Sequence, residues 1–251
     1  MKYQTIAICG KGGVGKTTLS ALFARILLEE GKRKVLLIDA DHAGGLTQAL
    51  QILPKKTINQ IRTQTIREIR QKSSDSKDLA MGIDYFLLQA LGEKNNLAFL
   101  SLGRPEEVGC YCPVNSLLRQ AIEILAGQFD LTLIDAEAGI EQINRKVMSR
   151  VEYLLLVSDP TGKGIKVAGE IYSVAKRLNP KTRAGLLLNR IQNPFEQETI
   201  SRLTDLSIIG WLEEDSLVRE FDLKERSFLE FPINAPSIKT LEQILKAQEI
   251  L

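Results

Sequence analysis

The sequence predicts an α/β protein built on a single doubly wound, mostly parallel sheet flanked by helices. Short apolar runs alternate with longer stretches whose apolar residues recur at helical spacing. Several short runs, such as residues 154–157, are apolar at every position, as expected for strands that helices cover on both faces. The chain has 251 residues, of which 44% are hydrophobic, so it can bury the core of one large domain spanning residues 1–251.

The expected elements follow one another in a regular rhythm. Seven apolar runs are predicted to be strands: residues 5–9, 35–38, 97–102, 131–134, 153–157, 185–188 and 208–209. Apolar residues at 3.6-residue spacing predict four helices: residues 19–28, 115–126, 165–178 and 238–251. The remaining chain includes a helical, basic insertion at about 55–95 and a loop at about 103–113.

Composition excludes several functional classes. The 33 Lys and Arg residues nearly balance 31 Asp and Glu residues, which is not the charge of a protein that coats nucleic acid or an acidic membrane. No run approaches the roughly 18 apolar residues of a membrane span, and no signal-peptide cleavage pattern follows residues 5–9. We therefore expect a cytoplasmic protein with neither a nucleic acid nor a membrane as partner.

A glycine-rich motif lies between the first predicted strand and the first predicted helix. Residues 10–17 fit the pattern G-x-x-x-x-G-K-[ST] of a phosphate-binding loop, in the structural context that this motif requires. Backbone N–H groups of such a loop form an anion-binding nest, and Lys16 can reach the β and γ phosphates of a nucleotide. Thr17 is the expected Mg²⁺ ligand. The predicted nucleotide-binding residues of this segment are Gly10, Gly12, Gly13, Val14, Gly15, Lys16, Thr17 and Thr18.

Acidic residues follow two of the predicted strands. Asp39 and Asp41 come directly after residues 35–38, and Asp135 comes after residues 131–134. Carboxylates at the carboxyl ends of parallel strands face the ligand crevice, where they meet Mg²⁺ or water. Taken alone, each aspartate is equally typical of a helix cap or a turn. The phosphate loop is what favours a role in the site.

The loop contains a second lysine, Lys11, and Lys11–Thr18 resembles the deviant Walker A loop. This loop is typical of the family that contains the nitrogenase iron protein, septum-positioning and chromosome-partitioning ATPases, and metal-delivery ATPases. The resemblance implies an ATP-bridged homodimer, with Lys11 reaching the partner's nucleotide as an arginine finger would. It also implies that Asp41 orients or activates the attacking water, that Asp39 supports the magnesium shell, and that Asn189 contacts the adenine. Asp135 matches the Walker B position of the family, with Ala138 and Gly139 behind it as a switch that senses the γ-phosphate. The family usually has proline after the second acid, where this chain has His42, its only histidine.

Cys110 and Cys112 form a C-x-C pair in the loop at about 103–113. Thiolates select nickel, zinc, copper or iron clusters over hard ions, but two thiolates cannot close a tetrahedral site. A two-fold dimer could supply four thiolates. A redox pair, or a chance occurrence, remains an alternative at this point. The third cysteine, Cys9, lies on the first predicted strand and is expected to be a small buried hydrophobic residue.

The block from Gly109 to Cys112, together with residues 135–141, closely resembles carbon monoxide dehydrogenase maturation ATPases of the CooC and AcsF type. The resemblance extends from Ile6 to about Pro236. It implies an ATPase that binds Ni²⁺, or Zn²⁺, at Cys110 and Cys112 and delivers nickel to a client enzyme, carbon monoxide dehydrogenase or acetyl-CoA synthase. Departures are His42 and residues 142–144, because in these relatives a histidine often follows the glutamate that corresponds to Glu141.

A basic stretch suggests other functions. Residues 55–77 carry seven basic and two acidic residues, which is typical of a solvated helix but also of a docking face for an acidic partner. An alternative function is therefore a positioning or partitioning ATPase that binds DNA or membrane through an ATP-dependent dimer, with no use for the cysteine pair. A third is an electron-transfer ATPase with an iron–sulfur cluster.

Overall fold

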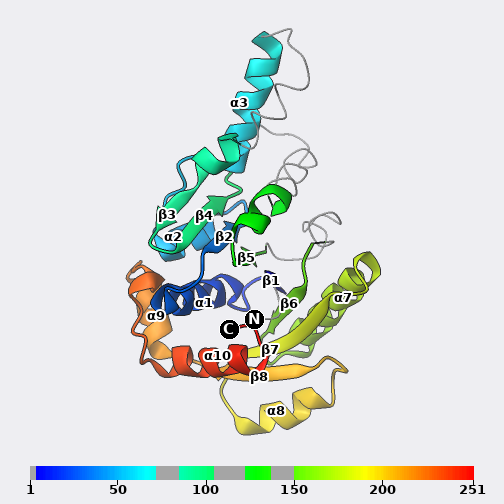
Figure 1. Cartoon of the computed structure of the whole chain (residues 1–251). Coiled ribbons are helices and arrows are strands. Elements are labelled where there is room, and N and C mark those ends of the chain that lie inside the picture. Colours follow the sequence, from blue (N-terminus) through cyan, green and yellow to red (C-terminus); the bar gives the residue numbers. More distant parts are fainter. Residues whose placement is uncertain (1–3, 72–84, 105–121, 137–149) are drawn as a thin grey trace.

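All seven predicted strands belong to one eight-stranded sheet in the computed structural model, which describes residues 4–71, 85–104, 122–136 and 150–251 (Figure 1). The strand order is β3-β4-β2-β5-β1-β6-β7-β8, and only β3 runs antiparallel to its neighbour. The doubly wound, mostly parallel sheet predicted from the sequence is thus confirmed. The strands are β1 (Thr5–Gly10), β2 (Val35–Asp39), β3 (Gly92–Lys94), β4 (Leu97–Ser101), β5 (Leu131–Asp135), β6 (Tyr153–Ser158), β7 (Arg183–Ile191) and β8 (Ile208–Glu213).

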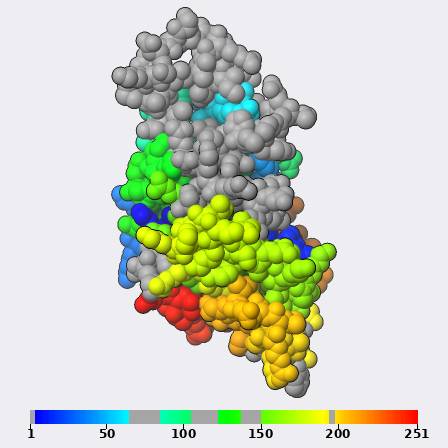
Figure 2. All heavy atoms as spheres, turned by 90° about the vertical axis from the view of Figure 1, so that its right-hand side faces the viewer, coloured from blue at the N-terminus to red at the C-terminus, as the bar shows by residue number. Residues whose placement is uncertain are grey.

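Helices cover both faces of the sheet and bury two separate apolar layers. On one face lie α1 (Lys16–Glu30), α2 (Gly45–Leu50), α9 (Ser216–Leu223), the short 3₁₀ helix η2 (Phe228–Glu230) and α10 (Pro236–Ala247). On the other lie the start of α3 (Ile58–Gln71), helical residues 85–90 and 122–125, α7 (Gly162–Leu178) and part of α8 (Pro194–Ser201). Figure 2 shows α7, in yellow-green, across the middle of this second face. Burial on both faces explains why the central strands are apolar at every position.

The last helix is shorter than predicted. The apolar spacing predicts a helix over residues 238–251, but α10 spans Pro236–Ala247. Its start fits Pro236 at the first helical position, where the missing N–H costs nothing. Its end is followed by Glu249 with a φ of 57°, which no helix continues, and Ile250 then packs into the core. The prediction extended too far because Ile250 and Leu251 continue the apolar pattern beyond the helical backbone.

Other elements were predicted in part or missed. Of the helix expected at residues 115–126, residues 122–125 are helical and the 3₁₀ helix η1 (Ala126–Gln128) follows, whereas residues 115–121 lie outside the described ranges. In the basic insertion, α3 confirms the expected helix. It extends away from the sheet at the top of Figure 1. Within the ranges that the structure describes, no helix combines the length and apolarity needed to cross a bilayer.

Candidate functional site

The phosphate loop lies between the end of β1 and the start of α1. Gly13 and Gly15 have φ values of 82° and 94°, which favour glycine, and Gly15 caps the N-terminus of α1. Val14, at 1% exposed, anchors the loop in the core between the two glycines. Because the loop turns directly into α1, its backbone N–H groups and the helix N-terminus converge on one anion-binding position.

Two lysines of this loop were predicted to act on phosphate. Lys16 is 8% exposed, and its Nζ donates a hydrogen bond to the Lys11 carbonyl at 3.2 Å, so its side chain lies folded along the loop. Lys11 itself is half-buried. The ammonium of Lys16 is therefore already positioned beside the anion nest, where a nucleotide phosphate can replace the carbonyl as its partner.

Asp135 contacts Thr17, the residue that the sequence predicts as a Mg²⁺ ligand. The Thr17 hydroxyl donates to Asp135 Oδ2 at 2.8 Å, and the Ser20 hydroxyl donates to Asp135 Oδ1 at 2.8 Å. Asp135 is 1% exposed, and burial raises its pKa to about 7 despite these two hydrogen bonds, with the nearby Asp39 adding to the rise. A buried carboxylate beside a hydroxyl fits a hard divalent cation, which would supply the missing positive charge. Thr17 and Asp135 are the residues that would hold Mg²⁺ here.

Asp39 is brought beside Asp135 by the register of β2 and β5, in which the two residues are paired. Its Oδ2 accepts hydrogen bonds from the Thr47 N–H at 2.9 Å and the Thr47 hydroxyl at 2.8 Å. Burial raises the pKa of this carboxyl as well, against the effect of the hydrogen bonds from Thr47. Thr47, at the start of α2, thus fixes Asp39 at the edge of the site.

Asp41 and His42 begin the turn between β2 and α2. Asp41 Oδ1 accepts a hydrogen bond from the Ala43 N–H at 2.8 Å, and the half-buried side chain lies one turn before α2. His42 Nδ1 lies 3.0 Å from the Gly103 carbonyl, just after the end of β4. The histidine that replaces the usual proline therefore connects this turn to the neighbouring strand.

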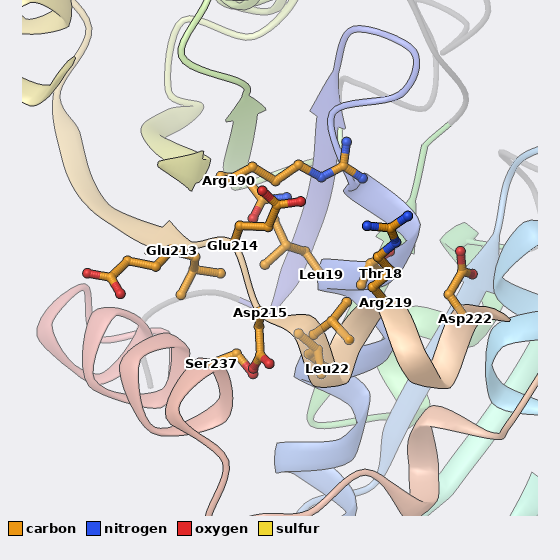
Figure 3. Close-up of a pocket in the computed structure, with 13 residues that line it drawn as sticks. Thr18, Leu19, Leu22, Arg190, Glu213, Glu214, Asp215, Arg219, Asp222 and Ser237 are labelled. Atoms are coloured by element: carbon orange, nitrogen blue, oxygen red, sulfur yellow. The ribbon is translucent and has the colours of Figure 1, made fainter. Parts of the chain in front are cut away.

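The end of β7 approaches the same loop from the other side. Asn189 Nδ2 donates to the Val14 carbonyl at 2.9 Å, and Arg190 donates to the Gly13 carbonyl at 3.1 Å. Both side chains also line a cavity of about 270 Å³ between the start of α1, the end of β8 and α9 (Figure 3). Its polar lining is Thr18, Asn189, Arg190, Glu213, Glu214, Asp215, Arg219, Asp222 and Ser237. The cavity adjoins the phosphate loop through Thr18, so a base or ribose bound there would place its phosphates at the nest.

Of the three cysteines, the structure describes only Cys9. Cys110 and Cys112 lie outside the described residues, as do Ala138 and Gly139. Cys9 is 1% exposed, and burial raises the pKa of its thiol to about 12, so it stays protonated and is a poor metal ligand. Among the residues that the structure describes, no group of three or more His, Cys, Asp or Glu side chains could hold a metal ion.

Sequence reasoning missed three residues of this site. Ser20, Thr47 and Arg190 each donate to a residue that was predicted. Ser20 could have been found, because it is one turn after Thr17 and is the polar residue of an otherwise apolar run of α1. Thr47 and Arg190 depend on the turn before α2 and on the end of β7, whose conformations no local pattern predicts.

A strand, a glycine-rich loop, a buried lysine and two buried strand-end carboxylates define a P-loop nucleoside triphosphatase. The family model described as an AAA domain matches residues 3–186, and the chain belongs to this family. An uncharacterized ATP-binding protein of Methanocaldococcus jannaschii is 30% identical over 245 residues, covering 95% of this chain and 96% of that one. The carbon monoxide dehydrogenase accessory protein CooC of Rhodospirillum rubrum is 28% identical over 228 residues, which is 86% of each chain.

Solved structures agree on the fold. A ParA family ATPase from Chlorobium tepidum superimposes with a TM-score of 0.74 at 20% identity, over 98% of this chain and 99% of that one. The cell division ATPase MinD of Pyrococcus furiosus gives a TM-score of 0.68 at 21% identity, over 98% of each chain. These likenesses show that the chain has the fold of the MinD and ParA ATPases.

Proposed function

We propose that the protein is an ATP-dependent nickel-delivery factor for carbon monoxide dehydrogenase or acetyl-CoA synthase. In this proposal two chains close on two ATP molecules, and Cys110 and Cys112 of both chains converge on one Ni²⁺ ion, the cargo. Hydrolysis then opens the dimer and releases the metal to the client enzyme. The similarity to CooC over 86% of the chain and the Cys110–Cys112 pair together support this assignment.

One structural observation carries the coupling between nucleotide and metal. The strand that leads toward the cysteines, β4, is bonded at its end to the strand and turn that hold Asp39 and Asp41. The Leu102 N–H donates to the Asp39 carbonyl at 2.8 Å, and the Gly103 carbonyl lies 3.0 Å from His42 Nδ1. A displacement of the turn that contains Asp41 would therefore move Gly103, which precedes Cys110 by seven residues in the sequence.

The nucleotide chemistry is assigned to the residues around the phosphate loop. Lys16 would bind the β and γ phosphates, and Thr17 and Asp135 would hold Mg²⁺ with support from Asp39. Asp41 would orient the attacking water, and Lys11 would reach the partner's nucleotide in an ATP-bridged homodimer. Asn189 would contact the adenine in the cavity of Figure 3.

A shared thiolate site makes metal affinity depend on nucleotide state. Two thiolates per chain leave the coordination of a soft divalent ion incomplete, whereas four thiolates from two chains complete it. Because the dimer geometry differs between nucleotide states, ATP can set metal affinity by population shift. The same four thiolates would also accept Zn²⁺, so the physiological metal must be measured.

The test is an anaerobic nickel titration of metal-stripped protein with and without ATP, with native mass spectrometry on the same samples. We expect tight binding of about one Ni²⁺ per two chains, which the Cys110→Ser/Cys112→Ser variant loses. Cys9→Ala is the matched control, because the buried Cys9 thiol stays protonated and is therefore a poor metal ligand. Weak binding, or equal binding by the wild type and the double variant, would rule out the proposed metal site. A zinc titration run in parallel identifies the preferred ion.

A positioning or partitioning function is the second candidate. It is favoured by the basic helix α3, which extends from the body of the protein and lies within the basic stretch of residues 55–77. It predicts ATP-dependent binding to nonspecific DNA or anionic vesicles that weakens steeply between low and moderate salt. Such binding by the double cysteine variant, together with no nickel binding by the wild type, would favour this function. Visible absorbance from an iron–sulfur cluster would instead indicate an electron-transfer ATPase.

A further inference from the structure

The end of β7 has an irregular backbone at the point where it meets the phosphate loop. The pairing of β7 with β8 shifts register between Leu188 and Ile191, so the residues between them form an irregularity in the strand. Within it, Arg190 has a φ of 61°, in the left-handed region that side chains other than glycine and asparagine seldom adopt. An arginine is retained in a strained conformation only where surrounding contacts determine it.

The contacts that this backbone makes possible are with two successive carbonyls of the loop. Asn189 Nδ2 donates to the Val14 carbonyl at 2.9 Å, and Arg190 donates to the Gly13 carbonyl at 3.1 Å. In a regular strand, adjacent side chains point to opposite faces and could not both reach one loop. The left-handed residue removes this alternation, so Asn189 and Arg190 act together.

Holding these carbonyls also fixes two N–H groups. In a planar trans peptide, the C=O of one residue and the N–H of the next point in opposite directions. Binding of the Gly13 carbonyl on the β7 side therefore turns the Val14 N–H away from β7, and binding of the Val14 carbonyl does the same for the Gly15 N–H. These two N–H groups belong to the anion nest that precedes α1.

Gly15 shows how closely this contact is built. A Cβ atom at Gly15 would clash with Asn189 Nδ2, and the φ of 94° independently favours glycine there. The backbone conformation of Gly15 favours glycine, and a Cβ atom there would displace the Asn189 amide from its present position at the Val14 carbonyl. The contact between β7 and the loop is accordingly part of the site's construction.

We propose that Asn189 and Arg190 are positioning residues for the phosphate loop, which hold the Val14 and Gly13 carbonyls so that the N–H groups of Gly15 and Val14 are oriented toward the nucleotide phosphates before the nucleotide arrives. This inference depends on ATP binding alone and is independent of the nickel-delivery function. It gives Asn189 a second role beside the predicted contact with adenine. Arg190 had no predicted role, and this inference assigns it one.

The decisive variant is Arg190→Gly, because it removes the side chain and the backbone strain together. Glycine adopts a φ of 61° without cost, so the variant's melting temperature should stay equal or rise. Its affinity for ADP should nevertheless fall about tenfold, as expected for loss of a charge-assisted hydrogen bond that organises the site. Affinity for adenosine, which lacks phosphates, should fall far less, although Arg190 also lines the cavity. Arg190→Lys retains one donor and should recover part of the ADP affinity.

The second readout is the nucleotide-free loop itself. In ¹H–¹⁵N spectra of protein without nucleotide, the Val14 and Gly15 amides should shift in Arg190→Gly and in Asn189→Asp, which replaces a donor by a carboxylate beside the Val14 carbonyl. Arg183→Gln, at the opposite end of β7, is the matched control and should change neither these signals nor ADP affinity.

Three results would overturn the proposal. Unchanged ADP affinity in Arg190→Gly would show that the contacts do not organise the nest. A parallel loss of ADP and adenosine affinity would place Arg190 against the base or ribose in the cavity. A selective loss of ADP affinity without any shift of the Val14 and Gly15 amides in nucleotide-free protein would mean that Arg190 binds the phosphate directly.

Discussion

Asp135 gives the sharpest test of the site's electrostatics, because its carboxyl has a pKa of about 7 in the folded protein against 3.8 for an ordinary aspartate. Between these two values the folded protein keeps a proton that the unfolded chain has already lost. The contribution of Asp135 to the free energy of unfolding of nucleotide-free protein must then fall as pH rises from about 4 to about 7, with a slope of about 1.4 kcal/mol per pH unit. Over the whole range this amounts to about 4 kcal/mol, and above pH 7 the contribution is constant.

The perturbation is Asp135→Asn, which keeps the shape of the side chain and removes its titration. Wild type and variant should have similar stabilities near pH 4, where Asp135 is neutral in both states. The variant should become more stable than the wild type by up to about 4 kcal/mol at pH 8. Asp39 titrates in both proteins, and because its charge contributes to the raised pKa of Asp135, the difference reports Asp135 together with this coupling.

The assay is urea unfolding at pH 5, 6, 7 and 8 in the presence of a chelator, with stability obtained by linear extrapolation. Asp205→Asn is the control, because this exposed carboxylate precedes β8 at the end of the sheet opposite the site. Its pH profile should run parallel to that of the wild type. Saturating Mg²⁺ and ADP should flatten the wild-type slope, since the cation stabilises the ionised carboxylate. If Asp135→Asn and wild type keep a constant difference from pH 5 to pH 8 without Mg²⁺, the assigned pKa is wrong.

Three further predictions concern Ser20, which contacts this carboxylate, and the phosphate loop. Ser20→Ala removes a buried hydrogen bond to Asp135 and should lower the free energy of unfolding by about 1–2 kcal/mol, measured in urea at pH 8. Because the Ser20 hydrogen bond lowers the pKa of Asp135, the pH midpoint for Mg²⁺–ADP binding should rise above that of the wild type. An unchanged midpoint would contradict this effect of Ser20. Gly15→Ala, with its clash against Asn189, should abolish ATP hydrolysis and destabilise the protein by about 1–3 kcal/mol, whereas Gly127→Ala, in open space, should be nearly neutral in both assays. Lys16→Ala should lose ADP binding in calorimetry. Lys11→Ala should bind ADP normally but hydrolyse ATP about 10³-fold more slowly, because its role is at the partner's nucleotide. Equal loss of ADP binding in both variants would argue against this role of Lys11.

The sequence predicted the sheet well because its central strands are buried on both faces and therefore apolar throughout. Strand β3 was missed since its three residues, Gly92–Lys94, are at an edge and carry no apolar alternation. The short helices α2, α8 and α9 have only 6 to 8 residues, too few for a periodic pattern to be distinguished from a loop.

The residues of the site likewise include some that the sequence could predict and some that it could not. The residues of the phosphate loop and the strand-end aspartates could be predicted because a motif and a sheet edge fix their positions. Thr47 and Arg190 could not, because their roles follow from contacts between segments far apart in the sequence. Arg190 contacts a loop 177 residues away, and only the strand order β1-β6-β7 brings them together.

These contacts give the two sides of the phosphate loop different mechanical properties. On the β7 side, hydrogen bonds from Asn189 and Arg190 end on carbonyls of the loop itself, so they hold the nest in one geometry. On the β2 side, Asp41 and His42 lie in a turn whose bonds lead outward to Gly103, beyond the end of β4. A γ-phosphate bound between them would meet the carbonyl-anchored loop on one side and the turn of Asp41 and His42 on the other. Of these two sides, the described contacts connect only the turn to Gly103, just after the end of β4, through His42.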